Sequence, residues 1–230
     1  MRSFVFTLGF HEDFILRRLS RKAAQPGERV LVLTASPVVG GVRSAFNSLV
    51  EQCGRLGLGA PELVALDLTD EAWALAELIN RLRGLEEPIV ADLSGGMRAL
   101  CVLALLALLL SGRRFELYVV AEGGEAGELH LPAGVARALS SLSREKVEIL
   151  REIARSPGVS VEALARRLGR SLKTVRNHLS ELKSMGLVSS RGRGAPLELT
   201  RWGLVLAGAP GESRELAVKV TAGPESSSPV

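Results

Sequence analysis

Cysteine, histidine and aromatic residues are scarce in this chain of 230 residues. It has two cysteines and three histidines, and Phe, Trp and Tyr together make up 4% of it. Two cysteines without a CxxC pair or a Cys/His cluster do not fit a disulfide framework or a zinc site. We therefore expect no metal, and we expect Cys53 and Cys101 to be buried thiols in a reducing compartment.

Motifs of common nucleotide-using and hydrolytic enzymes are also missing. The chain has no GxxxxGK[ST] phosphate-binding loop, no GxGxxG dinucleotide fingerprint and no GxSxG nucleophile elbow. No catalytic residue and no cofactor are predicted from these patterns.

No apolar run is long enough for a membrane span. Met97 to Leu109 has twelve apolar residues out of thirteen, with Arg98 as the exception, whereas a spanning helix needs about 20. This stretch is predicted to be a helix buried between a sheet and a neighbouring subunit. The start MRSFVFTLGF lacks the cationic and apolar parts of a signal peptide, so a cytoplasmic protein without a membrane partner is expected.

Positive charge is concentrated in one region. Residues 1–139 hold 14 Lys and Arg against 16 Asp and Glu, residues 140–207 hold 13 against 6, and residues 208–230 hold 2 against 3. A short basic region of this density predicts a polyanionic partner such as double-stranded DNA.

Residues 1–139 alternate short apolar runs with longer segments of helical period. This alternation predicts an α/β domain with a Rossmann-like, doubly wound, mostly parallel sheet. Strands are expected at residues 4–8, 30–33, 62–66, 89–92, 115–120 and 128–131, and helices at 11–24, 41–57, 70–84 and 97–111. Ligands bind such sheets outside the carboxyl ends of the strands, where the strand order reverses.

The segment DLSGGMR follows the fourth expected strand and leads into the apolar helix. Gly95 and Gly96 allow a close approach of the backbone, Ser94 adds a hydroxyl and Arg98 a guanidinium, so the segment is a candidate anion site. An ordinary structural turn explains SGG about as well. For Asp92, a bond to the turn backbone is favoured over contact with a ligand.

Residues 140–207 contain only helical patterns, followed by two short apolar stretches around a Gly-rich basic turn. Ser143, Ser160 and Ser171 are candidate helix N-caps. Three helices and a hairpin predict a small winged helix-turn-helix domain. Residues 208–230 form a tail rich in Ser, Pro and Gly that we expect to be partly disordered.

In a helix-turn-helix, the N-terminal part of the second helix approaches the bases. Leu172, Val175, Leu179 and Leu182 form its expected buried stripe, which leaves polar residues on the other faces. Candidate DNA contacts are therefore Ser171, Lys173, Thr174, Arg176 and Asn177, with Arg191 and Arg193 at the tip of the wing. The alternative is a winged helix that contacts protein, with these charges on a solvated face.

The pattern S-x-x-T-V-x-x-H-L-x-x-L-x-x-x-G-L-V begins at Ser171, and TLGF and DLSGGMR follow the first and fourth expected strands. Together they resemble the archaeal CRISPR-associated transcriptional regulators with a CARF domain and a winged helix (Csa-type regulators), over about residues 1–207. The resemblance implies a homodimer whose merged pockets bind a cyclic oligoadenylate, usually the tetra-adenylate. The ligand-binding residues it suggests are Thr7, Leu8, Gly9 and Phe10 from the first motif and Ser94, Gly95, Gly96, Met97 and Arg98 from the second, to which Ser36 is added.

The chain departs from the family pattern at two positions. Met97 stands where many members have a polar residue, and Asp92 places a negative charge near a site for phosphates. The resemblance also leaves open that the pocket slowly cleaves its own cyclic ligand without metal, with Ser94 and Arg98 as candidates. Phe10 is either a core anchor or a platform on which a base stacks.

Overall fold

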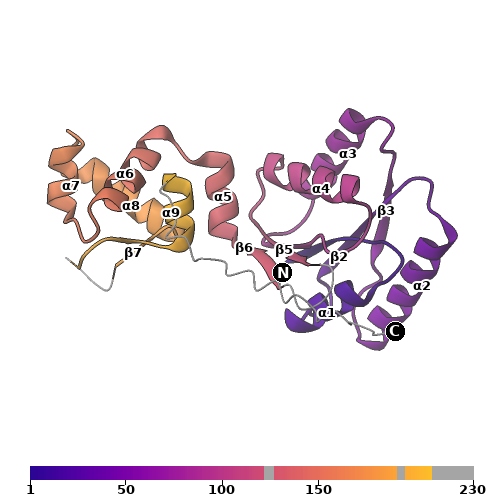
Figure 1. Cartoon of the computed structure of the whole chain (residues 1–230). Coiled ribbons are helices and arrows are strands. Elements are labelled where there is room, and N and C mark those ends of the chain that lie inside the picture. The colour runs from indigo at the N-terminus through magenta and orange to yellow at the C-terminus, as the bar shows by residue number, and fades with distance from the viewer. Residues whose placement is uncertain (122–126, 191–194, 209–230) are drawn as a thin grey trace, which may run out of the picture.

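The structure is a computed structural model that describes residues 1–121, 127–190 and 195–208. It begins with six strands and four helices that alternate along the chain (Figure 1). The strands are β1 (Ser3–Thr7), β2 (Arg29–Ala35), β3 (Glu62–Leu66), β4 (Ile89–Asp92), β5 (Phe115–Val120) and β6 (Glu128–Leu131). The helices between them are α1 (Asp13–Arg21), α2 (Gly40–Arg55), α3 (Glu71–Arg83) and α4 (Arg98–Leu110).

The six strands form one sheet in the order β3-β2-β1-β4-β5-β6. The first five strands are parallel, and β6 pairs antiparallel with β5. The strand order reverses between β1 and β4, which are direct neighbours. The predicted α/β fold with a mostly parallel sheet is confirmed, and every predicted strand and helix of this part is present with small shifts at its ends. We call residues 3–131 the sheet unit.

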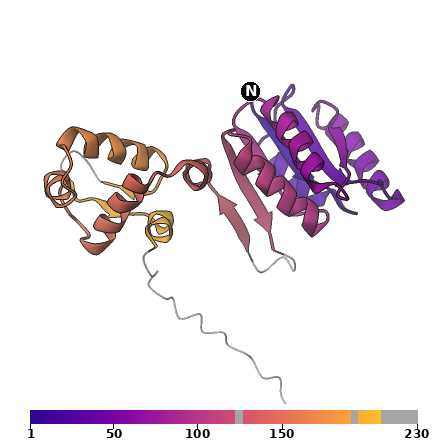
Figure 2. The same cartoon turned by 90° about the horizontal axis from the view of Figure 1, so that it is seen from above.

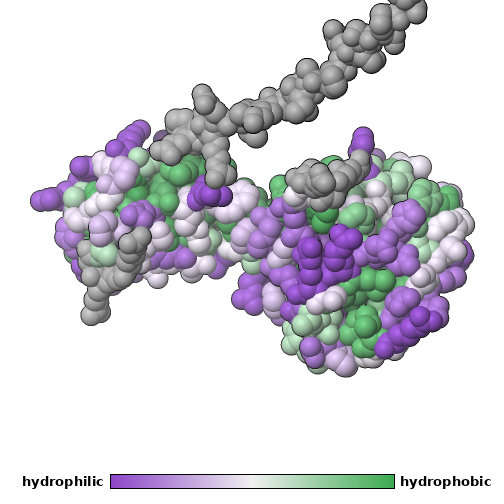
Figure 3. Space-filling model, turned by 60° about the horizontal axis from the view of Figure 1, so that its bottom comes forward, coloured by the Kyte–Doolittle hydropathy of each residue, from purple (hydrophilic) through white to green (hydrophobic). Residues whose placement is uncertain are grey.

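Helices cover both faces of the sheet. Phe4 and Phe6 of β1 pack with buried residues of α1 and α2 on one face. Val5 of the same strand belongs to the core on the other face, which includes α3 and α4. Because β1, β2 and β4 are buried on both sides, their apolar runs are nearly continuous. The outer surface is different: in Figure 3 hydrophilic residues form a broad band across the sheet unit.

Helix α4 is apolar on all sides but is not buried on all sides. Leu100, Leu103, Ala104, Ala107 and Leu108 face the core. On the opposite side Val102, Leu106 and Leu110 are 58%, 46% and 56% exposed. None of the helices in the described ranges is long and apolar enough to cross a membrane.

The chain continues after β6 into α5 (Ala133–Ser141), a helix that the sequence analysis did not predict. It runs through residue 139, which was the expected end of the first domain. Figure 2 shows α5 between the sheet unit and the last group of helices. That group, called here the C-terminal unit, contains α6 (Arg144–Arg155), α7 (Val161–Arg167), α8 (Leu172–Ser184), β7 (Val188–Ser189), β8 (Glu198–Leu199) and α9 (Arg201–Ala207).

The expected order of three helices and an antiparallel strand pair is found in the C-terminal unit. Ser143, Ser160 and Ser171 cap their helices, since each side chain accepts a hydrogen bond from a backbone N–H three residues later. Val175, Leu179 and Leu182 of α8 are buried as predicted, and Leu172 is partly buried. Helix α9 was not predicted.

Candidate functional site

The turns after β1 and β4 touch where the strand order reverses. The hydroxyl of Thr7 donates a hydrogen bond of 2.6 Å to the carbonyl oxygen of Gly95. A Cβ atom at Gly95 would lie 2.8 Å from the carbonyl oxygen of Thr7, so a larger residue would force the two turns apart. Gly96 has a φ of +81°, in the region that favours glycine. The packing of the turn therefore already requires both glycines.

A cavity of about 580 Å³ opens beside these turns. Segments after β1, β2, β3 and β4 all contribute to its wall. The lining residues are Leu8, Gly9, Phe10, His11, Thr34, Ala35, Ser36, Pro37, Val39, Val42, Leu68, Thr69, Gly96 and Met97. Most of these side chains are apolar, with a few hydroxyls and one imidazole among them. Such a lining suits a flat, largely apolar ring system.

Six of the ten predicted ligand residues line this cavity, namely Leu8, Gly9, Phe10, Ser36, Gly96 and Met97. Phe10 is 65% exposed and Met97 58% exposed. The exposure of Phe10 does not fit the role of a core anchor, because a core anchor would be buried. The sequence analysis missed the contributions of Thr34, Leu68 and Thr69, although their positions near the end of β2 and after β3 were a usable signal.

The other four predicted residues do not line the cavity. Thr7 and Gly95 hold the two turns together, and Ser94 lies in the hydrogen-bond network described next. Arg98 is the first residue of α4 and is exposed, without an ion pair to any other described residue. The side chain of Met97 does not cap the helix. The first N–H groups of α4 and the guanidinium of Arg98 therefore favour an anion at this helix end.

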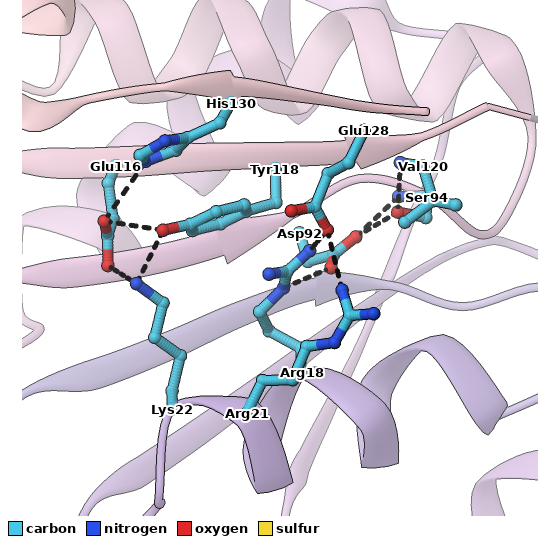
Figure 4. A network of polar contacts seen from close by, with 10 residues as sticks. All are labelled: Arg18, Arg21, Lys22, Asp92, Ser94, Glu116, Tyr118, Val120, Glu128 and His130. Atoms are coloured by element: carbon cyan, nitrogen blue, oxygen red, sulfur yellow. Dashed lines mark hydrogen bonds and ion pairs between the residues drawn. The ribbon is translucent and has the colours of Figure 1, made fainter. Parts of the chain in front are cut away.

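A buried ionic network lies behind the turn after β4 (Figure 4). Asp92 accepts hydrogen bonds from the backbone N–H of Ser94, at 3.0 Å, and from its hydroxyl. The other carboxylate oxygen accepts a bond of 2.7 Å from Arg18 Nε on α1. Because the side chains of Arg18 and Asp92 are only 4% and 2% exposed, this is a buried ion pair. The favoured sequence interpretation of Asp92, a bond to the turn, is confirmed.

The network extends to the last two strands of the sheet. The guanidinium of Arg18 also donates to Glu128 of β6, and it lies 3.7 Å from the ring centroid of Tyr118. The hydroxyl of Ser94 accepts a bond of 2.9 Å from the N–H of Val120. The donor of that hydroxyl is used by Asp92, so both of its bonds serve to hold the turn.

A second cluster lies beside this network. Lys22 Nζ donates to Glu116, at 2.6 Å, and to the hydroxyl of Tyr118. The ring of His130 stacks on Tyr118 with its centroid 4.4 Å away. Burial opposes ionisation of Glu116, but the bonds from Lys22 and Tyr118 outweigh it and lower the pKa of Glu116 below its ordinary value.

Arg18 and Glu128 were not predicted as site residues. The signal for Arg18 was a charged residue at an apolar-face position of a helix, three residues after the buried Ile15. The signal that such a cation exists was Asp92, a lone aspartate in a buried strand, because a buried carboxylate needs a compensating charge.

The predicted DNA-binding residues of α8 lie together at its N-terminal half. Lys173, Arg176 and Asn177 are exposed. The hydroxyl of Ser171 caps the helix and is 2.8 Å from that of Thr174. Arg176 forms an ion pair of 3.3 Å with Glu162 on α7. Arg191 and Arg193 lie outside the described residues. Within the described ranges, no group of three or more His, Cys, Asp or Glu residues is arranged to hold a metal ion.

Two family models match the chain. One, described as a Csa3 CRISPR-associated Rossmann-like domain, matches residues 2–132. The other, described as HVO_A0114, matches residues 141–202. A curated relative from Saccharolobus solfataricus, the "CRISPR locus-related putative DNA-binding protein Csa3", is 35% identical over 205 residues, which is 89% of this chain and 86% of the relative.

Two solved structures are also similar in part. Can2 from Sulfobacillus thermosulfidooxidans, in complex with cyclic tetra-adenylate, is 12% identical, covers 90% of this chain and 63% of its own, and has a TM-score of 0.34. The multiple antibiotic-resistance repressor MarR from Listeria monocytogenes is 27% identical, covers 29% of this chain and 48% of its own, and has a TM-score of 0.28. Both scores are too low to indicate a shared overall fold.

Removal of the buried cation should destabilise the sheet unit strongly. Arg18→Met leaves the buried carboxyl group of Asp92 without its cation, so the free energy of unfolding should fall by about 3–5 kcal/mol. Urea denaturation measures this loss. Arg17→Met, at the exposed neighbouring position, should change stability by only about 0.5 kcal/mol. The double variant Arg18→Met with Asp92→Asn should recover part of the lost stability. Equal losses of stability in Arg18→Met and Arg17→Met would contradict the structural role of the Arg18–Asp92 pair.

Proposed function

The chain belongs to the family of CRISPR-associated Csa3 proteins, and on this premise we propose that it is a dimeric, ligand-responsive DNA-binding regulator of CRISPR-linked genes. Its proposed ligand is a cyclic oligoadenylate, with the tetra-adenylate as the first candidate. The observation that carries this proposal is the meeting of the turns after β1 and β4 at the rim of the cavity, beside the anion-favouring start of α4.

The two parts of an adenylate would find different environments at this site. The apolar cavity offers contact to the face of a base, with the exposed ring of Phe10 available for stacking. The start of α4 offers N–H groups and Arg98 to a phosphate. The carboxylate of Asp92 does not oppose an anion there as an isolated charge would, because Arg18 neutralises it.

The exposed side of α4 supports the dimer. Val102, Leu106 and Leu110 are spaced by four residues and follow Arg98 by the same spacing, so all four lie along one side of the helix. Exposed apolar stripes of this kind are typical of subunit contacts. A two-fold pairing along this stripe in which the two α4 helices run in the same direction would bring their two Arg98 residues to one shared site, as a cyclic ligand with two-fold symmetry requires.

The C-terminal unit supplies the proposed contact with DNA. Its excess of Lys and Arg is local, and the exposed Lys173, Arg176 and Asn177 lie at the start of α8, which we interpret as the recognition helix of a winged helix-turn-helix. In the proposed dimer, ligand binding would favour one of two subunit arrangements and so change the spacing of the two recognition helices.

A charge placed in the apolar stripe should separate the proposed dimer. Leu106→Glu buries a carboxylate in the contact, so light scattering should give half the wild-type mass at micromolar concentration. Val50→Glu, at a half-exposed position of α2, is the matched control and should remain dimeric. A wild-type protein that is monomeric would refute this arrangement.

Loss of the guanidinium beside the turn should weaken ligand binding. Arg98→Ala removes a charge-assisted hydrogen bond, which contributes about 1.5–3 kcal/mol, so the Kd for cyclic tetra-adenylate should rise about 10-fold or more in calorimetry. Arg83→Ala, at the exposed end of α3, should bind as the wild type does. No binding by the wild type, or unchanged binding by Arg98→Ala, counts against the pocket.

Binding to the promoter of its own operon should weaken steeply with salt. Each phosphate contact adds about −0.9 to the slope of log K against log salt, so Lys173→Ala should reduce the slope by about 2 for a dimer. Gel shifts across a salt series measure this, with Arg83→Ala as the control. Absence of any salt-dependent shift would favour a winged helix that contacts protein instead.

A further inference from the structure

A single buried cation joins the turn after β4 to the last strand of the sheet. Asp92 ends β4, Arg18 lies on α1, and Glu128 is the first residue of β6. Figure 4 shows the guanidinium of Arg18 between the two carboxylates. Elements that are far apart in the sequence therefore meet at one side chain.

A second connection runs from the same turn to the same place. The hydroxyl of Ser94 bonds Asp92 and the N–H of Val120. Val120 lies directly opposite Glu128 in the pairing of β5 with β6. Both connections therefore arrive at the start of β6.

The helix that follows β6 in the chain, α5, packs against the end of the candidate recognition helix α8. β6 ends at Leu131, and α5 begins two residues later. On α5, Gly134 packs against the backbone of Met185, the C-cap residue of α8, so closely that a Cβ would lie 2.5 Å from the Met185 carbonyl oxygen. A displacement of β6 along its length would therefore be transmitted through α5 to the end of α8.

We propose that Arg18 is a positioning residue that transmits the state of the ligand turn to β6, and through α5 to α8. This inference rests on the proposed function, because it assigns the regulation of the same site. Asp92 is bonded to the turn at Ser94, so a ligand that shifts the turn also shifts the carboxylate that Arg18 must follow. Breaking the bond between Arg18 and Asp92 would leave a buried charge without its partner. Arg18 therefore moves with the turn, and Glu128 moves with Arg18.

We call the contacts that connect the turn through Asp92, Arg18 and Glu128 to β6 the relay. Glu128 is the position at which the relay can be broken with the least loss of stability. Its side chain is 28% exposed, its backbone stays paired with β5, and the pair between Arg18 and Asp92 remains when Glu128 is shortened. It does not line the cavity. Glu116 is the matched control, because it also pairs with a cation at the end of α1 but does not bond Arg18, Asp92 or Ser94.

The relay should be visible as the ratio of the DNA Kd values with and without ligand. In the full-length wild type, cyclic tetra-adenylate should change the Kd for promoter DNA by about 5-fold or more, as measured by fluorescence anisotropy. Glu128→Ala should bind ligand and DNA separately as the wild type does, but with a ratio close to one. Glu128→Gln keeps an acceptor for Arg18 and should restore part of the ratio, whereas Glu116→Ala should keep it. A wild-type ratio in Glu128→Ala, or an equal loss in Glu116→Ala, overturns the relay.

Amide hydrogen exchange separates the failure of the relay from the failure of the proposed function. Without ligand or DNA, Glu128→Ala should accelerate exchange at residues 94–98, although these residues follow β4 and β5 lies between β4 and β6. Glu116→Ala should not accelerate it. If cyclic tetra-adenylate does not bind the wild type or leaves its DNA affinity unchanged, the proposed function fails. Hydrogen exchange then still tests the connection between Glu128 and the turn after β4. That connection is refuted if exchange at residues 94–98 changes equally in Glu128→Ala and Glu116→Ala.

Discussion

Asp92 ends a strand that is buried on both faces, where a carboxylate needs a partner for its charge. Arg18 is that partner, in a buried ion pair. The consequence reaches beyond one ion pair, because the charged carboxylate can accept two bonds from Ser94 and so fixes the turn in front of α4. The cavity wall, the start of α4 and the contact with Thr7 all depend on that turn.

This constraint explains how the proposed anion site can lie in front of a buried negative charge. The two positive groups have different roles, since Arg18 is buried and neutralises Asp92, while Arg98 is exposed and has no partner among the described residues. In the motif DLSGGMR the same division separates residues that support the turn from residues to which ligand binding is proposed. Its first half holds the turn in place, and its second half faces the cavity and the solvent.

The periodicity of the sequence predicted the sheet unit well because strands β1 to β5 and the helices between them have strong, regular apolar patterns. Helices α5 and α9 were missed because both are short, with nine and seven residues, and their many small and apolar residues do not by themselves distinguish a helix from a connecting segment. Within the site, the sequence located the two turns that meet, but it did not distinguish residues that line the cavity from residues that support it. Ser94 has the composition of a ligand contact, and only the positions of Asp92 and Val120 reveal that its hydroxyl is already engaged. Local patterns could mark Arg18 and Asp92 separately, but they could not connect two residues that lie 74 positions apart.

The contact between Gly134 and Met185 involves backbone atoms at the end of α8 and not the side chains at its beginning. The exposed residues near the start of α8 can therefore be exchanged without disturbing this junction. A lineage of such proteins could acquire new operator sequences while the connection to the sheet unit stays the same. Under the proposed function, DNA recognition and its coupling to the ligand are therefore separable traits, on which selection can act independently.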